Sequence, residues 1–156
     1  MDRNLNASLS DCLKGRVCIV GVGNRQRGDD GAGPRVIDAR DPSAGGFWLD
    51  AGMAPENFLE PVVKEEPDSI LIVDAVAFGG DPGECQLIDP IKMETAAVST
   101  HAGSLDTLCL YLANRTGAQI KVLGIQPKSL DSTSGLSPPV EEAVIASAQS
   151  LSSLLS

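Results

Sequence analysis

The amino-acid sequence predicts an α/β fold: a three-layer sandwich in which a sheet of about five mostly parallel strands carries helices on both faces. Two observations indicate this class. Short apolar runs rich in β-branched residues recur without alternation, which is typical of strands that are covered on both faces. Segments with helical spacing of apolar residues separate these runs, and strands that alternate with helices favour a parallel sheet.

The expected strands follow from the apolar runs. The clearest run is Ser-Ile-Leu-Ile-Val-Asp-Ala-Val at residues 69–76. The run at 84–88 alternates in part, which suits an edge strand, and the run at 47–49 is short and closed by Asp50. We expect strands over residues 16–23, 47–49, 69–76, 84–88 and 119–125.

The segments between these runs have the spacing of helices. Leu105, Leu108, Cys109 and Leu112 recur at i, i+3, i+4 and i+7. Pro34 suits the first turn of a helix, and Pro61 has to lie in a first turn or kink its helix. We expect helices over residues 34–40, 55–66, 104–112 and 140–155.

The domain organisation is simple. A chain of 156 residues suffices for one buried core and is too short for two. Residues 1–14 are polar and charged, so we expect a loosely ordered leader there and a single α/β domain over residues 15–156. Residues 128–137 are rich in Ser and Gly and are expected to form a loop.

Charge and cysteine content exclude several classes of protein. Twelve basic and 21 acidic residues give a net charge of −9, which argues against nucleic-acid and membrane partners. No apolar run approaches the ~20 residues of a membrane helix, and residues 1–14 lack the apolar centre of a signal peptide. No cysteine has zinc-finger spacing, and Cys18 and Cys109 lie in runs expected to be buried. We expect a cytoplasmic protein with reduced thiols.

Polar residues that follow the predicted strands mark a candidate site. In an open α/β sheet the ligand binds beyond the carboxyl ends of the strands. Asp29 and Asp30 follow the first strand, Asp74 lies near the end of the third, and the only histidine, His101, precedes a predicted helix. Near a helix N-terminus the imidazole is favoured in its neutral form, which binds transition metals. Two carboxylates and one imidazole suit a borderline divalent ion such as nickel or zinc.

The residues of the glycine-rich segment are also compatible with roles unrelated to a metal. Gly21-Val22-Gly23 is similar to a dinucleotide fingerprint, but Gln26 stands where the third glycine belongs and two aspartates would repel a pyrophosphate, so no nucleotide is expected. The glycines can serve tight packing alone, and Asp29 or Asp30 can cap the helix that follows. Burying the Asp74 carboxylate unpaired inside an apolar strand costs several kcal/mol. The carboxylate therefore needs a hydrogen-bond donor, a metal or exposure at the end of the strand.

The motifs taken in order resemble a known family. The chain is similar to the [NiFe]-hydrogenase maturation endopeptidases from about residue 16 to residue 151, within the family most of all to the hydrogenase 3 type. The similar segments are Gly21-Val22-Gly23-Asn24, Gly28-Asp29-Asp30-Gly31-Ala32-Gly33-Pro34, Asp50-Ala51-Gly52, Ala54-Pro55-Glu56-Asn57, Leu71-Ile72-Val73-Asp74-Ala75, Pro82-Gly83-Glu84, Thr100-His101 and Gly124-Ile125-Gln126-Pro127. The resemblance implies a five-stranded, mostly parallel α/β sandwich.

The resemblance also implies an activity. Members of the family remove a C-terminal extension from the hydrogenase large-subunit precursor after nickel has been inserted. The family's metal-contacting residues correspond to Asp30, Asp74 and His101, and the nickel belongs to the precursor. On this hypothesis the metal polarises the scissile carbonyl or binds the attacking water. An alternative role for Asp30 or Asp74 is that of general base.

Substrate contacts and a non-catalytic alternative complete the hypothesis. We expect Asn24, Asp29, Gly31 and Gly33 to position the substrate, the glycines through backbone N–H groups. A docking module that checks the precursor for nickel without cutting it would have the same sequence features. Cleavage that is lost when Asp30 is replaced would distinguish the enzyme from the docking module.

Overall fold

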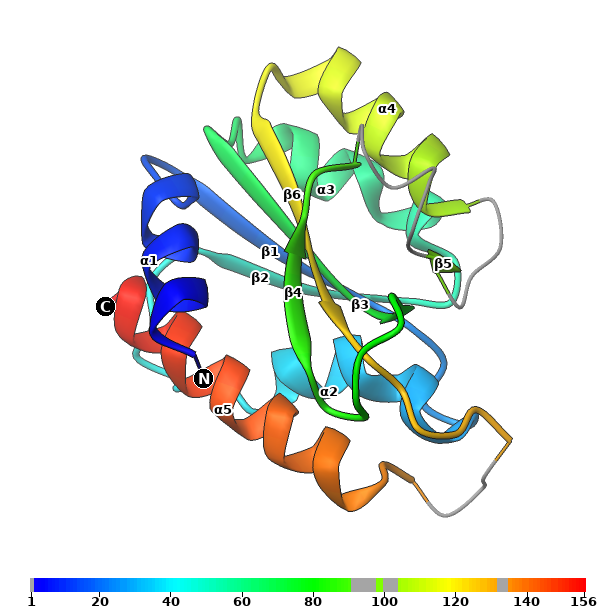
Figure 1. The fold of residues 1–156 in the computed structure, drawn as a ribbon. Helices are drawn as coiled ribbons and strands as arrows, with labels where there is room; N and C mark the ends of the chain where they lie inside the picture. Colours follow the sequence, from blue (N-terminus) through cyan, green and yellow to red (C-terminus); the bar gives the residue numbers. More distant parts are fainter. Residues whose placement is uncertain (1, 91–97, 100–103, 132–134) are drawn as a thin grey trace.

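The sheet forms the middle of three layers in the computed structural model, which describes residues 2–90, 98–99, 104–131 and 135–156 (Figure 1). Its strand order is β2-β1-β3-β6-β4, and neighbours among β2, β1, β3 and β6 run parallel. β4 is antiparallel to β6, and the short β5 pairs antiparallel with the end of β3. The strands are β1 (Val17–Val22), β2 (Phe47–Gly52), β3 (Ser69–Ala77), β4 (Cys85–Ile88), β5 (Val98–Ser99) and β6 (Gln119–Ile125).

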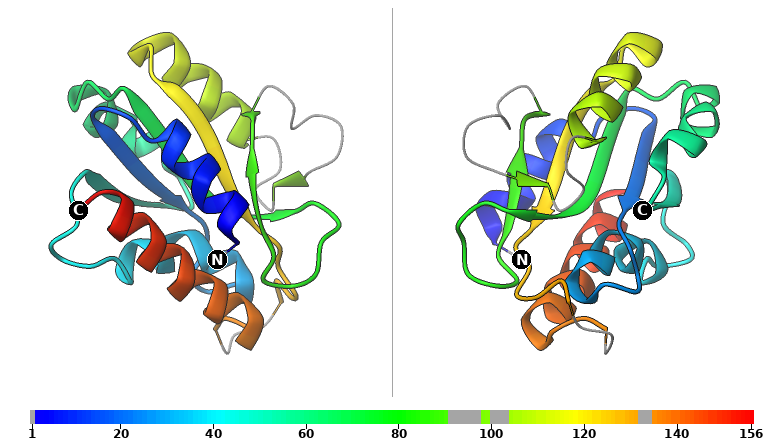
Figure 2. Two further views of the ribbon diagram at one scale, coloured as in Figure 1. Left: turned by 60° about the vertical axis from the view of Figure 1, so that its left-hand side comes forward. Right: turned by 90° about the vertical axis from the view of Figure 1, so that its right-hand side faces the viewer.

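Helices cover both faces of this sheet (Figure 2). Residues of α1, α2 and α5 pack in one apolar cluster, and residues of α3 and α4 pack in a second cluster on the opposite face. The helices are α1 (Arg3–Cys12), α2 (Ala32–Asp38), α3 (Leu59–Lys64), α4 (Ser104–Thr116) and α5 (Pro138–Leu154), with short 3-10 helices η1 (Gly28–Gly31) and η2 (Pro55–Phe58). The predicted fold class, a mostly parallel sandwich with helices on both faces, is confirmed.

The core is aliphatic, and each central strand contributes to both faces of the sheet. Ile19 of β1 and Leu71 of β3 belong to the cluster under α1, α2 and α5. Their chain neighbours Val20 and Ile72 belong to the cluster under α3 and α4. This burial on both sides explains why the strands have no polar alternation, and each fully buried Leu or Ile contributes roughly 1.5–3 kcal/mol.

Most of the segment expected as a loosely ordered leader forms the helix α1 (Arg3–Cys12), so this expectation was wrong for those residues. Asp2 caps the helix by accepting the N–H of Asn4 at 2.8 Å. Leu5, Leu9 and Cys12 lie on one side of the helix and pack against the core, where Leu9 is completely buried. Their spacing of four and three residues forms an apolar stripe that the polar composition of the segment conceals.

Two further elements differ in detail from the expectation. β2 runs to Gly52 rather than ending before Asp50, because Asp50 and Gly52 still pair with Gly21 and Val22 of β1. The helix expected over residues 55–66 is divided into η2 and α3, with Pro61 in the first turn of α3 as anticipated. β6 and the edge strand β4 lie where the sequence predicts them.

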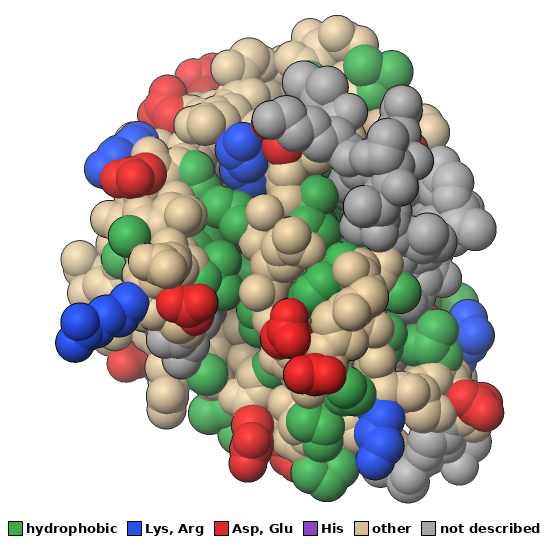
Figure 3. Space-filling view, in the orientation of Figure 1, with side chains coloured by type: hydrophobic (Ala, Val, Ile, Leu, Met, Phe, Trp, Pro, Cys, Tyr) green, Lys and Arg blue, Asp and Glu red, His purple; other side chains and the backbone are tan. Residues whose placement is uncertain are grey.

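Acidic side chains are frequent on the face drawn in Figure 3. On this face, Lys and Arg side chains stand apart from one another between acidic ones. Among the helices of the described segments, none is long and apolar enough to cross a bilayer.

Candidate functional site

The carboxyl ends of the parallel strands form one edge of the sheet, here called the rim. The glycine loop (residues 23–31) leaves β1 at the rim and passes through η1 into α2. Asp30 lies in η1 with 1% of its surface exposed, and Asp74 lies in the last part of β3 with 0% exposed. η1 packs against β3, so the two aspartates predicted to share a site belong to elements in contact.

Close packing of glycines brings η1 down onto the strand ends. A Cβ atom on Gly23 would lie 2.1 Å from the carbonyl oxygen of Asp30. A Cβ atom on Gly33 would lie 2.3 Å from the carbonyl oxygens of both Val22 and Val73. Since no side chain fits at these distances, the glycines allow the loop and the start of α2 to approach β1 and β3. Gly23 and Gly33 therefore serve tight packing.

Backbone hydrogen bonds give the glycine loop its shape. The N–H of Asn24 donates to the carbonyl of Asp30 at 3.1 Å, and the N–H of Asp30 donates to the carbonyl of Arg27 at 3.1 Å. Neither Asp29 nor Asp30 caps a helix, because α2 begins after Gly31 without a side-chain cap. The capping role considered for these aspartates was therefore wrong.

Asp74 is a carboxylate in a strand that is otherwise aliphatic. It is aligned with Gly124 of β6, and side-chain alternation along β3 places it on the same face as Ile72 and Val76. An ionised carboxylate in such surroundings is costly unless donors or a cation compensate it. Two buried aspartates on adjoining elements make the rim suited to a cation or to proton transfer.

His101, the third residue of the predicted set, lies outside the described residues. Ser99, two residues earlier in the chain, pairs with Val76, two residues after Asp74. Without His101, the described segments contain no group of three or more His, Cys, Asp or Glu side chains that could hold a metal ion.

Asp29 is held by the chain itself. Its Oδ2 accepts the N–H of Lys128 at 2.8 Å, the N–H of Ser129 at 3.1 Å and the hydroxyl of Ser137 at 2.8 Å. Its Oδ1 accepts the N–H of Ser137 at 2.7 Å. Burial raises the pKa of Asp29, but these hydrogen bonds outweigh burial and the pKa lies below its usual value. Its carboxylate is thus occupied internally, which differs from the substrate contact that we expected.

The other residues expected at the substrate also have internal roles. The Oδ1 atom of Asn24 accepts the N–H of Gln26 at 2.9 Å, which closes a turn within the glycine loop. A Cβ atom on Gly31 would lie 3.0 Å from the Cα atom of Arg25, so Gly31 lets the loop fold back on itself. The side chain of Asn24 and the lack of a side chain at Gly31 therefore both serve the shape of the glycine loop.

Gln126 organises the segment after β3, a role that the sequence alone did not reveal. Its Oε1 atom accepts the N–H of Phe78 at 2.9 Å and the N–H of Gly80 at 3.2 Å. Its backbone N–H donates to Glu84 and its carbonyl accepts from Gly83. A polar residue directly after a buried strand was the available signal.

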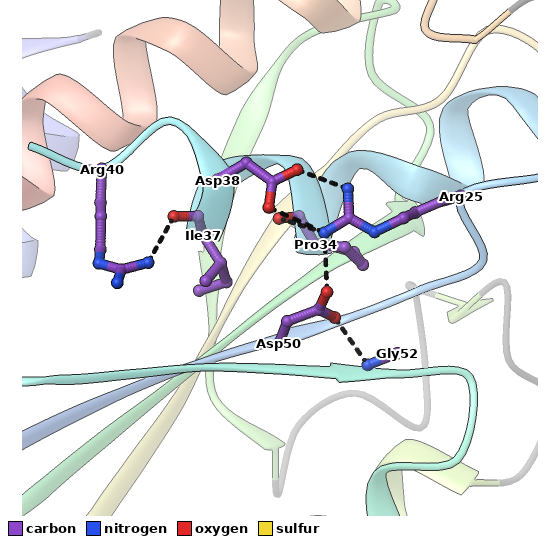
Figure 4. Close-up of polar contacts among 7 residues, drawn as sticks. All are labelled: Arg25, Pro34, Ile37, Asp38, Arg40, Asp50 and Gly52. Atoms are coloured by element: carbon purple, nitrogen blue, oxygen red, sulfur yellow. Dashed lines mark hydrogen bonds and ion pairs between the residues drawn. The ribbon is translucent and has the colours of Figure 1, made fainter.

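Arg25 joins the glycine loop to α2 and β2, a second role that the sequence alone did not reveal (Figure 4). Its Nη2 atom lies 2.9 Å from Oδ1 of Asp38 and 2.7 Å from Oδ2 of Asp50, and its Nη1 atom contacts the other oxygen of Asp38. The hydrogen bonds from Arg25 lower the pKa of Asp38. Both partners come from elements that flank the rim.

An open groove adjoins the rim beside Arg25. It has a volume of about 490 Å³ and lies between the glycine loop, the end of β2 and η2. Met53 and Phe58 contribute exposed apolar side chains to it. Its lining comprises Gly23, Asn24, Arg25, Gln26, Asp50, Ala51, Gly52, Met53, Ala54 and Phe58.

Comparison with protein families identifies a match over most of the chain. Residues 46–153 match the family model described as HycI, hydrogenase maturation protease. The matched range contains Asp74 and excludes the glycine loop with Asp30. The hydrogenase 3 maturation protease of Escherichia coli (strain K12) is 36% identical over 129 residues, which cover 81% of this chain and 82% of that protein.

Solved structures of similar fold agree with the sequence match. The [NiFe] hydrogenase maturation protease HycI from Thermococcus kodakarensis KOD1 superposes with a TM-score of 0.83 at 32% identity, over 95% of this chain and 98% of that chain. The endopeptidase HycI from Escherichia coli superposes with a TM-score of 0.77 at 33% identity, over 89% of this chain and 90% of that chain. The first of these similarities extends over nearly all of the chain.

Proposed function

This chain belongs to the hydrogenase maturation protease family, and from that premise we propose that it removes the C-terminal extension of a nickel-loaded [NiFe]-hydrogenase large-subunit precursor. Membership makes the chain a peptidase that acts in hydrogenase maturation, which favours an enzyme over the non-catalytic docking module. The extension, the large subunit and the nickel requirement are our proposal.

The observation that carries the proposal is the pair of buried carboxylates at the rim. Asp30 and Asp74 stand on adjoining elements and are almost inaccessible to water. Carboxylate oxygens and an imidazole nitrogen are suitable ligands for a divalent transition ion. We propose that Asp30, Asp74 and His101 contact nickel that the precursor brings with it, so the ion is part of the substrate and no nucleotide or resident cofactor is needed.

This arrangement links a metal check to peptide hydrolysis. A divalent ion bound in the substrate supplies Lewis acidity to a nearby peptide carbonyl or water. Asp30 and Asp74 orient the loaded precursor by accepting the ion, and a carboxylate oxygen of either residue that does not contact the ion takes the proton of the attacking water. A precursor without nickel lacks the group that these residues recognise.

The groove beside the rim offers a place for the precursor chain. It is open, it continues from the glycine loop to η2, and Met53 and Phe58 offer apolar surface within it. We propose that the precursor segment next to the cleavage point lies along this groove. Four cysteines without disulfides suit the reducing cytoplasm, where we propose that the reaction takes place.

The decisive experiment compares two forms of one precursor. The purified protein is incubated with a large-subunit precursor of the hydrogenase 3 type, once nickel-loaded and once nickel-free, and the mass of the precursor's C-terminus is measured. We expect the extension to be lost only from the nickel-loaded form. Cleavage of both forms would overturn the metal check, and cleavage of neither form would overturn the proposed substrate.

Three isosteric variants assign the roles of the aspartates. Asp30→Asn and Asp74→Asn are each expected to abolish cleavage, whereas Asp11→Asn, at an exposed position on α1, is expected to cleave normally. Precursor binding separates metal contact from base catalysis. A metal contact is indicated if the variant no longer binds the nickel-loaded form more tightly than the nickel-free form. A general base is indicated if this preference remains while cleavage is lost.

A further inference from the structure

The carboxylate of Asp29 accepts more hydrogen bonds than a helix cap or a turn residue ordinarily does. Four donors converge on its carboxylate from Lys128, Ser129 and Ser137, and its own N–H donates to the carbonyl of Ser129 at 3.0 Å. It is 1% exposed although it lies between two surface loops. The glycine loop is thereby fastened to the two ends of the segment between β6 and α5.

The arrangement of the donors requires an ionised carboxylate. Oδ1 accepts one N–H and Oδ2 accepts two N–H groups and a hydroxyl. An asparagine in the same place would direct its NH₂ group at the N–H of Ser137 in one orientation and at the N–H groups of Lys128 and Ser129 in the other. Neither orientation satisfies the donors, so this cradle distinguishes a carboxylate from its closest isostere.

The cradle acts directly on the neighbouring residue. Asp30 follows Asp29 in the four-residue helix η1, and on its other side its carbonyl accepts the N–H of Asn24. Gly23 packs so closely against that carbonyl that no side chain fits between them. The backbone of Asp30 is therefore held between Gly23 and Asn24 on one side and the cradle of Asp29 on the other, and a fixed backbone limits the directions in which the side chain can point.

We propose that Asp29 is a positioning residue, which fixes η1 against Lys128, Ser129 and Ser137 and so sets the carboxylate of Asp30 at the rim beside Asp74. This inference rests on the proposed function of Asp30 in recognising or cleaving the precursor. It replaces the direct substrate contact that the sequence suggested for Asp29.

Asp29→Asn tests the proposal by two measurements. A crystal structure of the variant is expected to place the Asp30 carboxylate about 1 Å from its wild-type position, and kcat for the nickel-loaded precursor is expected to fall on the order of 100-fold with KM near the wild-type value. Assays are made at a temperature at which circular dichroism finds both proteins folded. An unmoved Asp30 carboxylate, or an unchanged kcat, would overturn the proposal.

Two serine variants provide a milder test with a matched control. Ser137→Ala removes one donor to Asp29 and is expected to lower kcat roughly three- to tenfold, the range that one hydrogen bond supplies. Ser129→Ala removes a hydroxyl that donates to Asp131 and leaves the backbone contact to Asp29, so kcat is expected to stay unchanged. Equal effects of the two variants would contradict the cradle.

The structural measurement keeps this inference separate from the proposed function. If the wild-type protein cleaves no precursor, the proposed function fails, and the position of Asp30 in Asp29→Asn still decides whether Asp29 positions it. If the wild-type protein cleaves and Asp29→Asn does so equally well, only the inference fails.

Discussion

The glycine loop is held at two places by opposite means. Near its start, Arg25 pairs with Asp38 and Asp50 at the surface, where the three side chains are 38%, 53% and 36% exposed. Near its end, Asp29 is buried and receives four neutral donors. Both contacts fasten the same loop to other parts of the chain, but water competes only for the exposed contact of Arg25.

The difference indicates which contact holds the glycine loop more firmly. An exposed ion pair contributes about 0–1 kcal/mol, because both charges are well solvated when it is broken. A buried carboxylate whose donors would otherwise be left without partners contributes more, since its loss also costs the desolvation of those donors. The Asp29 side of the loop, which adjoins Asp30, is therefore the better fixed.

The largest expected effect follows from replacing Asp29. Asp29→Asn is expected to lower the free energy of unfolding by about 3 kcal/mol, because an amide leaves at least one buried N–H facing another donor. Urea denaturation followed by circular dichroism measures the loss. A loss no larger than that of an exposed Asp→Asn change, such as Asp11→Asn, would show that the cradle contributes little.

Removal of a single donor should have an intermediate effect. Ser137→Ala is expected to cost about 1.5 kcal/mol, because its hydroxyl donates to a charged acceptor that keeps three other donors. The same denaturation experiment on Ser129→Ala is the control and should give a change within about 0.5 kcal/mol. The comparison fails if Ser129→Ala is the more destabilised of the two.

The surface contact should yield a smaller effect that depends on salt. Arg25→Ala is expected to cost less than about 1 kcal/mol at low ionic strength. Most of this difference should vanish in about 1 M NaCl, where the Debye length is about 3 Å. Unfolding free energies of both proteins at two salt concentrations measure it. If the loss of stability persists in salt, water does not screen the Arg25 contact, and the contrast with the buried Asp29 contact is wrong.

Acid should remove the same contact. The hydrogen bonds from Arg25 lower the pKa of Asp38 from its ordinary 3.8, so the ion pair contributes stability above that pH and loses it as Asp38 becomes protonated below it. The stability difference between the wild-type protein and Arg25→Ala is therefore expected to shrink between neutral pH and pH values below 3.8. A difference that grows in acid would contradict this assignment.

Buried thiols give the smallest expected effect and a contrast to the buried carboxylate. Burial raises the pKa of Cys18 to about 11 and that of Cys109 to about 12, so both stay neutral and inert at ordinary pH. We expect no reaction of either with a thiol reagent at about pH 8 in the native protein, and full reaction in urea. Mass spectrometry of the labelled peptides decides. Rapid native labelling of Cys109 would mean that α4 opens.

Much of the fold could be predicted from the sequence because its signals are local. Apolar runs without alternation predicted β1, β3 and β6, and helical spacing predicted α4 and α5. The helix α1 was missed because its apolar stripe is short and lies among polar residues, so only its packing on the sheet distinguishes it from a loosely ordered leader. β5, at residues 98–99, has no pattern of its own and exists through pairing with β3.

For the candidate site, the sequence by itself determined that Asp29 and Asp30 follow the first strand and that Asp74 lies near the end of the third, which places all three toward the carboxyl ends of the strands. Only the tertiary structure showed that the carboxylate of Asp29 is held within the chain. The partners of Asp29 lie 99 to 108 residues further along the chain, and Arg25 finds its partners 13 and 25 residues away. Hydrogen bonds act over about 3 Å in space, and partners this far apart in the chain leave no trace in local sequence, so only folding reveals that Asp29 is an aspartate held by the chain.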